Sequence, residues 1–299
     1  MSTTNSSTNT SNENNNIVWY VTGASKGLGL ELVKKLVQDG FKVVATTRSK
    51  QLLIDNLGEH YNTDQVLPLV VDLLNEDSIK QSISDSLAKF AKIDIVVNNA
   101  GYGLFGNFEN ITDEQARTQF DVNVFGVLNV IRNVLPHLRN NKTTEHGPHI
   151  FNISSITGFN GAFPNAGIYG ATKFAVDGIS QYLQTDLKPF GIHVTSVLPG
   201  VFKTEFLDPK SLVVAKDIPD YPSVQGFIDK FSELFQERTK VGDPSKFAAL
   251  LISISKEKNP PLTLPVGPDS FGLFEKRIES VQKDIAQFKD QTTSTNFSN

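Results

Sequence analysis

The chain lacks cysteine entirely and has one methionine and one tryptophan among its 299 residues. Without cysteine there can be no disulfide, no thiolate-ligated metal centre and no thiol nucleophile. Long apolar runs are also missing, since none approaches the ~20 residues of a membrane span. The first residues do not have the charge pattern of a targeting segment. We therefore expect a cytoplasmic protein that spans no membrane.

A strong excess of either charge is absent too. Lys and Arg number 28 against 32 Asp and Glu, which gives a net charge of −4. This mildly acidic balance argues against a nucleic-acid partner. Glu145, His146 and His149 lie in a Gly/Pro-containing segment without the spacing of a metal site, so we expect no metal and an exposed loop there.

Regular structure is not expected in residues 1–16, of which fourteen are Ser, Thr or Asn. Such a segment cannot bury enough apolar area to offset the entropy of ordering, so we predict a disordered tail. No linker-like composition interrupts residues 17–266, which we interpret as one domain. Residues 267–299 then form a C-terminal extension.

From residue 17 onward, short β-branched runs alternate with segments of helical periodicity. The runs predict strands at 17–22, 41–46, 66–71, 93–98, 149–154, 192–198 and 262–266, and the periodic segments predict helices at 28–37, 76–90, 113–138, 168–187, 224–238 and 271–288. Strands without internal alternation are typical of a sheet that is buried on both faces. The pattern predicts an α/β fold with a doubly wound, parallel sheet.

A glycine cluster, Thr-Gly-Ala-Ser-Lys-Gly-Leu-Gly at 22–29, lies between the first strand and the first helix. Glycines allow a tight turn and close approach to a diphosphate, and the helix N-terminus offers N–H donors. The alternative is a plain strand-to-helix turn. We expect this turn to hold a dinucleotide, and the candidate contacts are Gly23, Ser25, Lys26, Gly27, Leu28 and Gly29.

The second strand ends without the acidic residue that usually accepts from an adenosine ribose hydroxyl. Arg48 and Lys26 are available instead, and a cation there suits a 2′-phosphate. If these two residues are not simply solvated surface cations, the cofactor is NADP(H) in preference to NAD(H).

Tyr169 and Lys173 are four residues apart at the start of a predicted helix and share one face. An ammonium near a phenol favours the phenolate and lowers the pKa of the phenol from ~10. Tyr169 is therefore a candidate general acid and base.

Six elements in this order resemble the short-chain dehydrogenase/reductase family: residues 22–29, Asn-Asn-Ala-Gly at 98–101, Asn123, Ile-Ser-Ser at 153–155, Tyr169 with Lys173, and Pro-Gly at 199–200 with Thr204. The resemblance covers about residues 17–266, and the glycine spacing is that of the compact, single-domain branch. It implies a Rossmann fold of seven strands in the order 3-2-1-4-5-6-7, with a helical lid near the C-terminus. It also implies a homodimer or homotetramer, formed through the helices at 113–138 and 168–187.

The resemblance further implies an NADP-dependent carbonyl reductase or alcohol dehydrogenase with four catalytic residues. Tyr169 would exchange a proton with the substrate oxygen, Ser155 would bond that oxygen, Lys173 would assist Tyr169 and hold the nicotinamide ribose, and Asn123 would hold a water in a proton relay. Further cofactor contacts would come from Asn99, Val201, Thr204 and Asp72. Asp72 is equally compatible with a contact to adenine and with a helix cap.

Ser155 lies 14 residues before Tyr169, one more than the family spacing leads us to expect. Adjacent strand residues point to opposite faces, so Ser154 and Ser155 cannot both face the substrate. We choose Ser155 because Ile-Thr-Gly follows it, and we assign Ser154 to backbone support.

Phenylalanine is abundant, with 21 residues, and Phe227, Phe231 and Phe235 recur on one helical stripe. The stripe fits ordinary core packing or an apolar lid over a small-molecule carbonyl or alcohol substrate. Two other functions compete with the reductase. One is a non-catalytic dinucleotide-binding regulator, which the intact catalytic set disfavours. The other is a sugar epimerase or dehydratase, which the glycine spacing and short C-terminal region disfavour.

Overall fold

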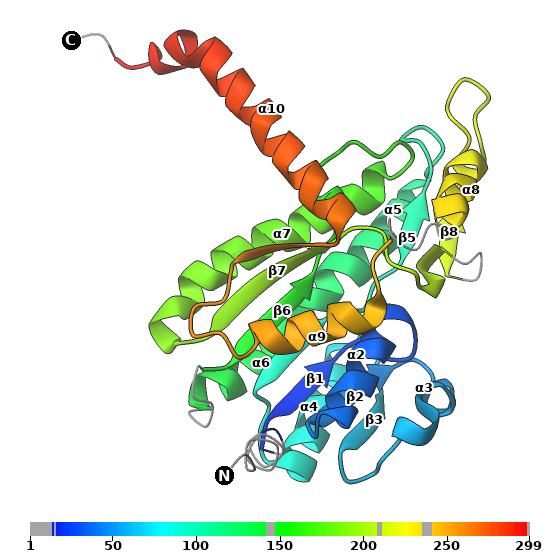
Figure 1. The fold of residues 1–299 in the computed structure, drawn as a ribbon, viewed down its shortest axis with the longest axis vertical. Helices are drawn as coiled ribbons and strands as arrows, with labels where there is room; N and C mark the ends of the chain where they lie inside the picture. Colours follow the sequence, from blue (N-terminus) through cyan, green and yellow to red (C-terminus); the bar gives the residue numbers. More distant parts are fainter. Residues whose placement is uncertain (1–13, 15, 142–146, 208–210, 235–240, 298–299) are drawn as a thin grey trace, which may run out of the picture.

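The structure is a computed structural model that describes residues 14, 16–141, 147–207, 211–234 and 241–297. The tail predicted at 1–16 lies outside these residues except for Asn14 and Asn16. A seven-stranded sheet has the order β3-β2-β1-β4-β6-β7-β9, and every neighbouring pair is parallel (Figure 1). The strands are β1 Val18–Val21, β2 Lys42–Thr47, β3 Val66–Val70, β4 Ile95–Asn98, β6 His149–Ile153, β7 His193–Pro199 and β9 Thr263–Val266. The predicted doubly wound sheet and its strand order are confirmed.

Alternate residues of each central strand pack on opposite faces of the sheet. Trp19 and Val21 of β1 belong to one buried apolar cluster, whereas Val18 and Tyr20 belong to the other. All four residues of β1 are buried. Because both faces are covered, the strand sequence shows no polar alternation.

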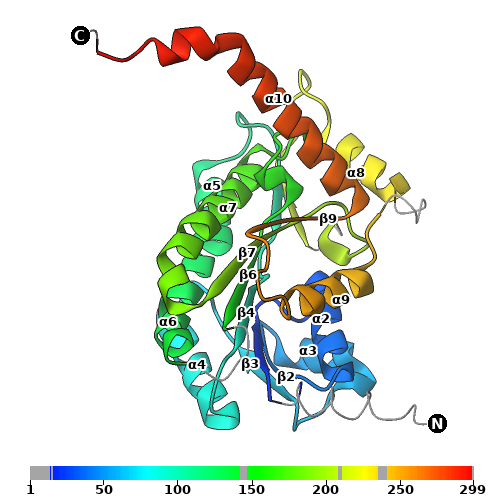
Figure 2. The same ribbon diagram turned by 60° about the vertical axis from the view of Figure 1, so that its left-hand side comes forward.

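Helices cover both faces. The helices α2 Gly27–Gln38, α3 Lys50–Leu57 and α9 Pro244–Ile254 lie on one side, and α4 Glu76–Phe90, α6 Gly126–Asn140 and α7 Gly167–Leu187 lie on the other (Figures 1 and 2). The sequence analysis missed α3 and α9. Helix α9 carries its core residues as two adjacent pairs, Phe247–Ala248 and Leu251–Ile252, and Asp243 caps its N-terminus. This Asp-Pro start was the signal that could have identified it.

The remaining helices and strands lie at the carboxyl ends of the main strands or beyond them. Strands β5 Gly103–Phe105 and β8 Leu212–Val214 form a separate parallel pair. Helix α5 spans Asp113–Phe120, α8 spans Val224–Leu234 and α10 spans Pro268–Thr293. Short 3₁₀ turns occupy Gly58–His60, Ile156–Gly158, Lys188–Phe190 and Glu205–Leu207. In the described part of the chain, no helix combines the length and apolar character needed to cross a membrane.

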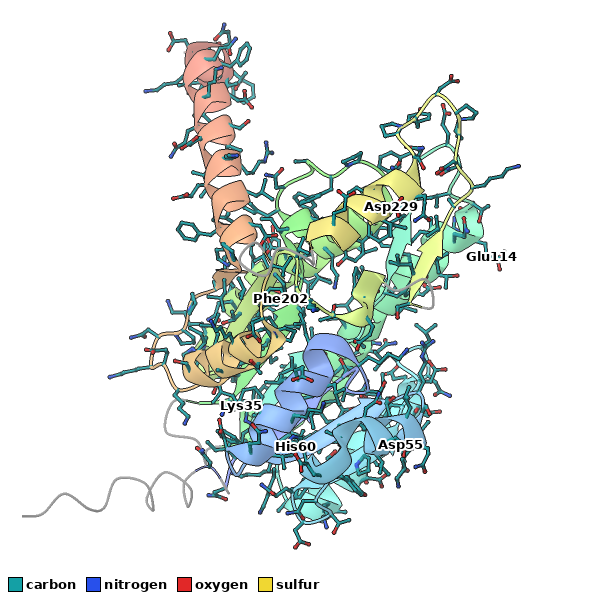
Figure 3. The ribbon with its side chains drawn as sticks, turned by 45° about the vertical axis from the view of Figure 1, so that its right-hand side comes forward. Lys35, Asp55, His60, Glu114, Phe202 and Asp229 are labelled. Atoms are coloured by element: carbon teal, nitrogen blue, oxygen red, sulfur yellow. The ribbon has the colours of Figure 1, made fainter. Side chains whose placement is uncertain are left out.

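The segment after β7 is fixed against α9. Phe202, which is labelled in Figure 3, lies in this segment. Its ring packs edge-on against Phe247, with ring centroids 5.4 Å apart. A Cβ at Gly242 would overlap the Phe202 ring. This packing holds in place the chain that follows the Pro199–Gly200 turn.

His149 is buried in β6, which corrects our expectation of an exposed loop at this residue; Glu145 and His146 lie outside the described residues. The ring stacks on Phe151 at 3.9 Å, and its Nε2 shares a hydrogen bond with Thr195 Oγ1 at 2.9 Å. Burial, together with a smaller contribution from neighbouring His193, lowers the pKa of His149 from 6.5 to about 3. The imidazole is therefore neutral in the folded protein above pH ~3.

This burial predicts a loss of stability on mild acidification. Between pH 7.5 and 5.5 the unfolded chain binds a proton at His149 and the folded chain does not, so the free energy of unfolding falls by about 1.4 kcal/mol from this group. Urea unfolding at both pH values measures the loss. His149→Gln should remove that part of the pH dependence, whereas His60→Gln, at a surface site, should retain it. Equal dependence in wild type and His149→Gln would contradict the assignment.

Candidate active site

A cavity of about 840 Å³ lies at the carboxyl ends of the central strands and runs from the glycine turn to Tyr169. It brings together residues that lie far apart in the sequence. The predicted site residues that line it are Gly23, Ser25, Lys26, Gly27, Leu28, Arg48, Asp72, Asn99, Ser155, Tyr169, Lys173, Val201 and Thr204. Gly29 and Asn123 are buried beside the cavity and do not line it.

The glycine turn has no room for side chains at two positions. A Cβ on Gly29 would lie 2.5 Å from both Gly23 O and Asn99 Nδ2. Gly23 has a φ of +66°, and a Cβ there would lie 2.8 Å from Ala100 Cα. The amide of Asn99 donates to Thr22 O at 2.9 Å and to Gly23 O at 3.1 Å. Asn99 therefore braces the turn from β4, in addition to lining the cavity.

The N-terminus of α2 presents backbone donors to the cavity. Lys26 is the N-cap, its side chain makes no capping hydrogen bond, and the first turn carries no acidic residue. The first N–H groups of a helix have no partner within the helix and attract anions. These features fit the diphosphate of a dinucleotide.

The end of the cavity that is far from Tyr169, where β2 ends, carries two basic side chains. Arg48 and Lys26 are both exposed and line the cavity. Within the described residues neither forms an ion pair with a carboxylate. Asp72 lies across from them, and its Oδ1 accepts from Leu74 N at 3.0 Å. Asn75, not Asp72, caps α4, so Asp72 is not the helix cap that we considered.

Tyr169 and Lys173 lie on the first two turns of α7, on the face toward the sheet. Both are buried, and the Ser155 hydroxyl lies close enough to Tyr169 to lower the pKa of its phenol. Lys173 Nζ donates to Ile153 O at 2.8 Å. Ser154 Oγ donates to Lys173 O at 2.8 Å. Ser155 therefore faces Tyr169 while Ser154 supports the α7 backbone, which is the arrangement that we chose between the two serines.

The pKa of Tyr169 differs from our expectation. Burial raises it to about 12, and the hydrogen bond with Ser155 offsets part of the increase. Burial also lowers the pKa of Lys173 to about 8. Lys173 Nζ lies 5.8 Å from the centroid of the Tyr169 ring and is bonded to a carbonyl, so it does not depress the Tyr169 pKa as predicted.

Asn123 lies in a π-helical turn, Asp121–Phe125, that separates α5 from α6. We had predicted one continuous helix over 113–138. Asn123 Oδ1 accepts from Tyr102 N at 3.1 Å, and Nδ2 donates to Tyr102 O at 3.1 Å and to Thr172 Oγ1 at 3.2 Å. A Cβ on Gly101 would lie 3.0 Å from Asn123 Oδ1 and 3.6 Å from Lys173 Nζ. The π-turn thus brings Asn123 close to the surroundings of Lys173.

The loop after β7 closes the cavity from the opposite side. Val201 N donates to Asp269 Oδ2 at 2.8 Å, and Asp269 lies in the first turn of α10. A Cβ on Gly27 would lie 3.5 Å from Thr204 Cβ, so Thr204 faces the glycine turn. Sequence reasoning missed Asp269 because its partner lies 68 residues away.

Aromatic side chains surround Tyr169. Its ring centroid lies 5.9 Å from that of Phe105 and 5.7 Å from that of Phe206, and Phe105 lies 5.5 Å from Phe227 of α8. The apolar part of the cavity, which we call the aromatic chamber, is formed by Phe105, Phe163, Ala166, Phe206, Leu212 and Phe227. The two interpretations of the phenylalanine stripe are therefore both partly right, because Phe227 lines the cavity while Val224 and Ile228 are core. The Phe231 side chain and Phe235 lie outside the described residues.

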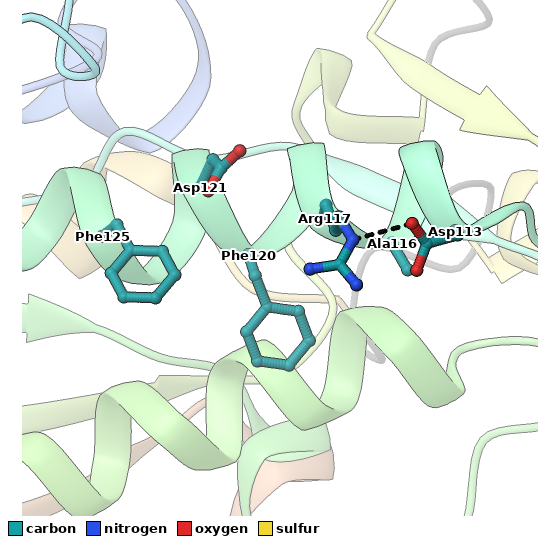
Figure 4. A pocket seen from close by; sticks show the side chains of 6 residues that line it. All are labelled: Asp113, Ala116, Arg117, Phe120, Asp121 and Phe125. Carbon is teal, nitrogen blue, oxygen red and sulfur yellow. Dashed lines mark hydrogen bonds and ion pairs between the residues drawn. The ribbon is translucent and has the colours of Figure 1, made fainter.

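A second, smaller cavity of about 360 Å³ lies on α5 and the π-turn, lined by Asp113, Ala116, Arg117, Phe120, Asp121 and Phe125 (Figure 4). Arg117 Nε and Asp113 Oδ2 form an ion pair of 2.7 Å within α5. Phe125 is half exposed there. None of the predicted catalytic or cofactor residues lines this cavity.

The seven-stranded, doubly wound parallel sheet with helices on both faces defines the class as an α/β protein with a Rossmann-like fold. The family model described as short chain dehydrogenase matches residues 17–212. The chain therefore belongs to the short-chain dehydrogenase family and is an oxidoreductase.

Relatives support this membership along most of the chain. "Oxidoreductase BOA17" of Botryotinia fuckeliana is 34% identical over 91% of this chain and 97% of that protein. A 3-ketodihydrosphingosine reductase of Bacteroides thetaiotaomicron is 34% identical over 90% and 94%. The crystal structure of a short-chain dehydrogenase from Streptomyces avermitilis superposes with a TM-score of 0.82 at 30% identity, covering 94% of this chain and 98% of that one.

Two more distant structures hold a nicotinamide cofactor. A 3-ketoacyl-(acyl-carrier-protein) reductase from Brucella melitensis, 26% identical with a TM-score of 0.67, is complexed with NADH; the alignment covers 83% of this chain and 95% of that one. A serine dehydrogenase, 27% identical with a TM-score of 0.69, is complexed with NADP+; here the coverage is 85% and 96%. Proteins of this fold thus bind either dinucleotide.

Proposed function

We propose that the protein transfers a hydride between NADP(H) and an apolar carbonyl or alcohol substrate, with Tyr169 as the general acid and base. One observation carries this proposal: Tyr169 and Ser155 line the same cavity, which begins at the glycine turn, and the Tyr169 ring lies in its aromatic chamber. The division into a catalytic domain at 17–266 and an extension at 267–299 is part of the same proposal.

Each residue of the catalytic set has a distinct task. The nicotinamide, when bound, supplies or accepts the hydride. Tyr169 donates a proton to the carbonyl oxygen during reduction and removes one from the alcohol during oxidation, and Ser155 bonds the same oxygen. Lys173, bonded to Ile153 O beside Tyr169, holds the nicotinamide ribose. Asn123 holds the water through which Lys173 exchanges protons with solvent.

The pKa of Tyr169 favours carbonyl reduction. With a pKa near 12, the hydroxyl stays protonated and able to donate throughout the neutral range. Alcohol oxidation needs a proton acceptor at Tyr169, so its rate should rise with pH. The buried, uncharged hydroxyl is therefore better prepared for the reductive direction.

The preference for NADP(H) rests on this chain's own charges, since similar structures hold either cofactor. Arg48 and Lys26 flank the cavity at the end of β2, and residues 45–50 include no acid. A 2′-phosphate would gain charge-assisted hydrogen bonds at this point. Gly23, Ser25, Gly27, Leu28 and Gly29 would hold the diphosphate, and the remaining contacts would be Asp72 to adenine, Asn99 to its ribose, and Val201 and Thr204 to the nicotinamide end.

The aromatic chamber sets the substrate class. Its walls offer apolar area around the reacting hydroxyl, and burial of a substrate's apolar part there contributes about 25 cal/mol per Å². A relative of similar length is named a reductase of 3-ketodihydrosphingosine, which is a ketone with a long apolar chain. We infer an apolar ketone, aldehyde or alcohol rather than a sugar phosphate.

Phe227→Ala tests the role of the chamber. Loss of this wall should lower kcat/KM for an apolar ketone by about tenfold, because a buried phenylalanine contributes ~1.5–3 kcal/mol of apolar contact. Small charged carbonyls should be affected less. Phe190→Ala, which removes an exposed ring outside the cavity, is the matched control. An equal loss for both substrate classes would contradict the assignment.

The proposed function as a whole is tested by cofactor consumption. Purified protein is supplied with NADPH or NADH and a panel of apolar, polar and charged carbonyls. We expect NADPH to be consumed fastest with apolar ketones or aldehydes. Tight NADPH binding without consumption by any carbonyl would favour the dinucleotide-binding regulator instead, and best turnover of small charged carbonyls would refute the apolar substrate.

Assembly and location belong to the same proposal. Phe125, Phe174 and Tyr182 are large, exposed side chains on the π-turn and α7. Exposed aromatic residues on adjacent helices fit a subunit interface. We propose a cytoplasmic homodimer or homotetramer that associates through these helices.

A further inference from the structure

Helix α10 extends away from the body of the protein, as both ribbon views show (Figures 1 and 2). Only its first turns are attached. Ser270 Oγ donates to Leu198 O at 2.7 Å, Asn160 Nδ2 donates to Leu273 O at 3.0 Å, and Phe274 stacks on Phe159 at 4.0 Å. From Glu275 to Phe297 every residue is exposed. The root of the helix is therefore fixed, and roughly 30 Å of helix beyond it contacts nothing else among the described residues.

Apolar residues recur along this free helix with alternating spacings of three and four residues. Ile285 is 63% exposed and Phe288 is 47% exposed, far more than a core stripe allows. A 3.5-residue apolar period is the pattern of helices that pair side by side in a coiled coil. We call the set Ile278, Val281, Ile285 and Phe288, which begins beyond the attached Phe274, the α10 seam.

The seam assigns heptad positions to the rest of the helix. Ile278 and Ile285 take position a, and Val281 and Phe288 take position d. Ile at position a is preferred in two-stranded, parallel coiled coils. The residues opposite the seam, at position f, are Lys276, Lys283 and Asp290. All three are charged, as expected for the face of a coiled coil that points to solvent.

Charges beside the seam match a second copy in the same direction. In a parallel pair, a residue at position g faces the residue five places later at position e of the partner. Asp284 then faces the partner's Lys289, an attractive pair that occurs twice by symmetry. Arg277 faces the partner's Gln282, which is neutral. A parallel pair therefore has no like-charge contact at these positions.

The same charges disfavour a membrane surface. Helices that lie on membranes carry a polar face rich in Lys and Arg. Helix α10 has four basic residues and five acidic ones, and both signs alternate along its length. We propose that the α10 seam pairs in parallel with the α10 seam of a second copy of this chain, an interface separate from the helices α5 to α7.

Single cysteines test this pairing cleanly, because the chain has no cysteine of its own. Ile285→Cys places a thiol at position a, where a parallel partner brings the same thiol opposite. Lys283→Cys is the matched control at position f. Both sites are exposed, so each variant should keep the wild-type melting temperature.

Under mild oxidation, Ile285→Cys should form the covalent dimer at least about 100-fold faster than Lys283→Cys at micromolar protein, because paired thiols react at an effective concentration of order millimolar. Equal rates would overturn the proposal. So would cross-linking of Ile285→Cys only to Val281→Cys in a mixture, which indicates antiparallel helices. Binding of wild type to phosphatidylcholine and phosphatidylserine vesicles without cross-linking of Ile285→Cys would assign the seam to a membrane and also overturn it.

A charge exchange supplies an independent readout. Asp284→Lys should weaken self-association in sedimentation velocity, since it places two lysines opposite each other. The double variant Asp284→Lys with Lys289→Asp should restore it. Unchanged association in the single variant, or failure of the double variant to recover, would contradict the parallel register.

Discussion

Tyr169→Phe is expected to lower the kcat of carbonyl reduction by about 10²- to 10⁴-fold, the usual contribution of a well-placed general acid. The substitution removes one oxygen and leaves the ring between Phe105 and Phe206. The substrate oxygen then loses its proton donor and keeps only the hydrogen bond from Ser155. Steady-state consumption of NADPH with an apolar ketone measures the loss.

Cofactor binding separates this effect from misfolding. The dissociation constant for NADPH, followed by its fluorescence, should change little, because Arg48, Lys26 and the glycine turn lie at the other end of the cavity. Tyr182→Phe removes a hydroxyl from an exposed tyrosine on the same helix and should retain full activity. Retention of wild-type turnover in Tyr169→Phe would refute the role of Tyr169.

Arg48→Asp is expected to weaken NADPH binding by at least about 10- to 100-fold, because a charge-assisted hydrogen bond contributes ~1.5–3 kcal/mol. The new carboxylate also repels a 2′-phosphate and can accept from a ribose 2′-hydroxyl. NADH should therefore bind as well as before or better, and the preference should reverse. Equilibrium titration of both cofactors measures the two constants.

The control for Arg48 lies on the same strand. Lys42 begins β2 at the opposite edge of the sheet, so Lys42→Ala removes a charge from β2 without touching the cavity. It should leave both constants unchanged. Equal affinity of the wild-type protein for NADPH and NADH would contradict the charge-based preference, as would an Arg48→Asp variant that loses both cofactors alike.

The sheet could be predicted because each of its strands is recognisable from a short, continuous segment of the sequence. Each main strand is a short run rich in β-branched residues, and the central strands β1, β4 and β6 are buried along their whole length. Each boundary falls within two residues of the predicted one. The glycine turn and the Tyr169–Lys173 pair were likewise visible, since their spacing alone places them on one turn or one helix face. Ser155 could be chosen over Ser154 from its sequence context.

What could not be predicted depends on contacts between distant segments. The π-turn at Asn123 forms where the side chain reaches Tyr102, which lies 21 residues earlier. The pairing of β5 with β8 joins segments more than 100 residues apart. The raised pKa of Tyr169 depends on its burial, and Lys173, which is bonded to Ile153 O, does not offset it. The spacing of residues along the sequence does not predict the π-turn, the pairing of β5 with β8 or the burial of Tyr169.

Transfer of deuterium tests the central claim most directly. The wild-type protein is supplied with an apolar ketone and NADPH that carries deuterium at the hydride position of C4, and the alcohol product is analysed by mass spectrometry. Our account predicts one deuterium on the carbinol carbon with wild type and essentially no labelled product with Tyr169→Phe. Bound NADPH that yields no labelled alcohol with any ketone, or equal labelling by both proteins, would contradict it.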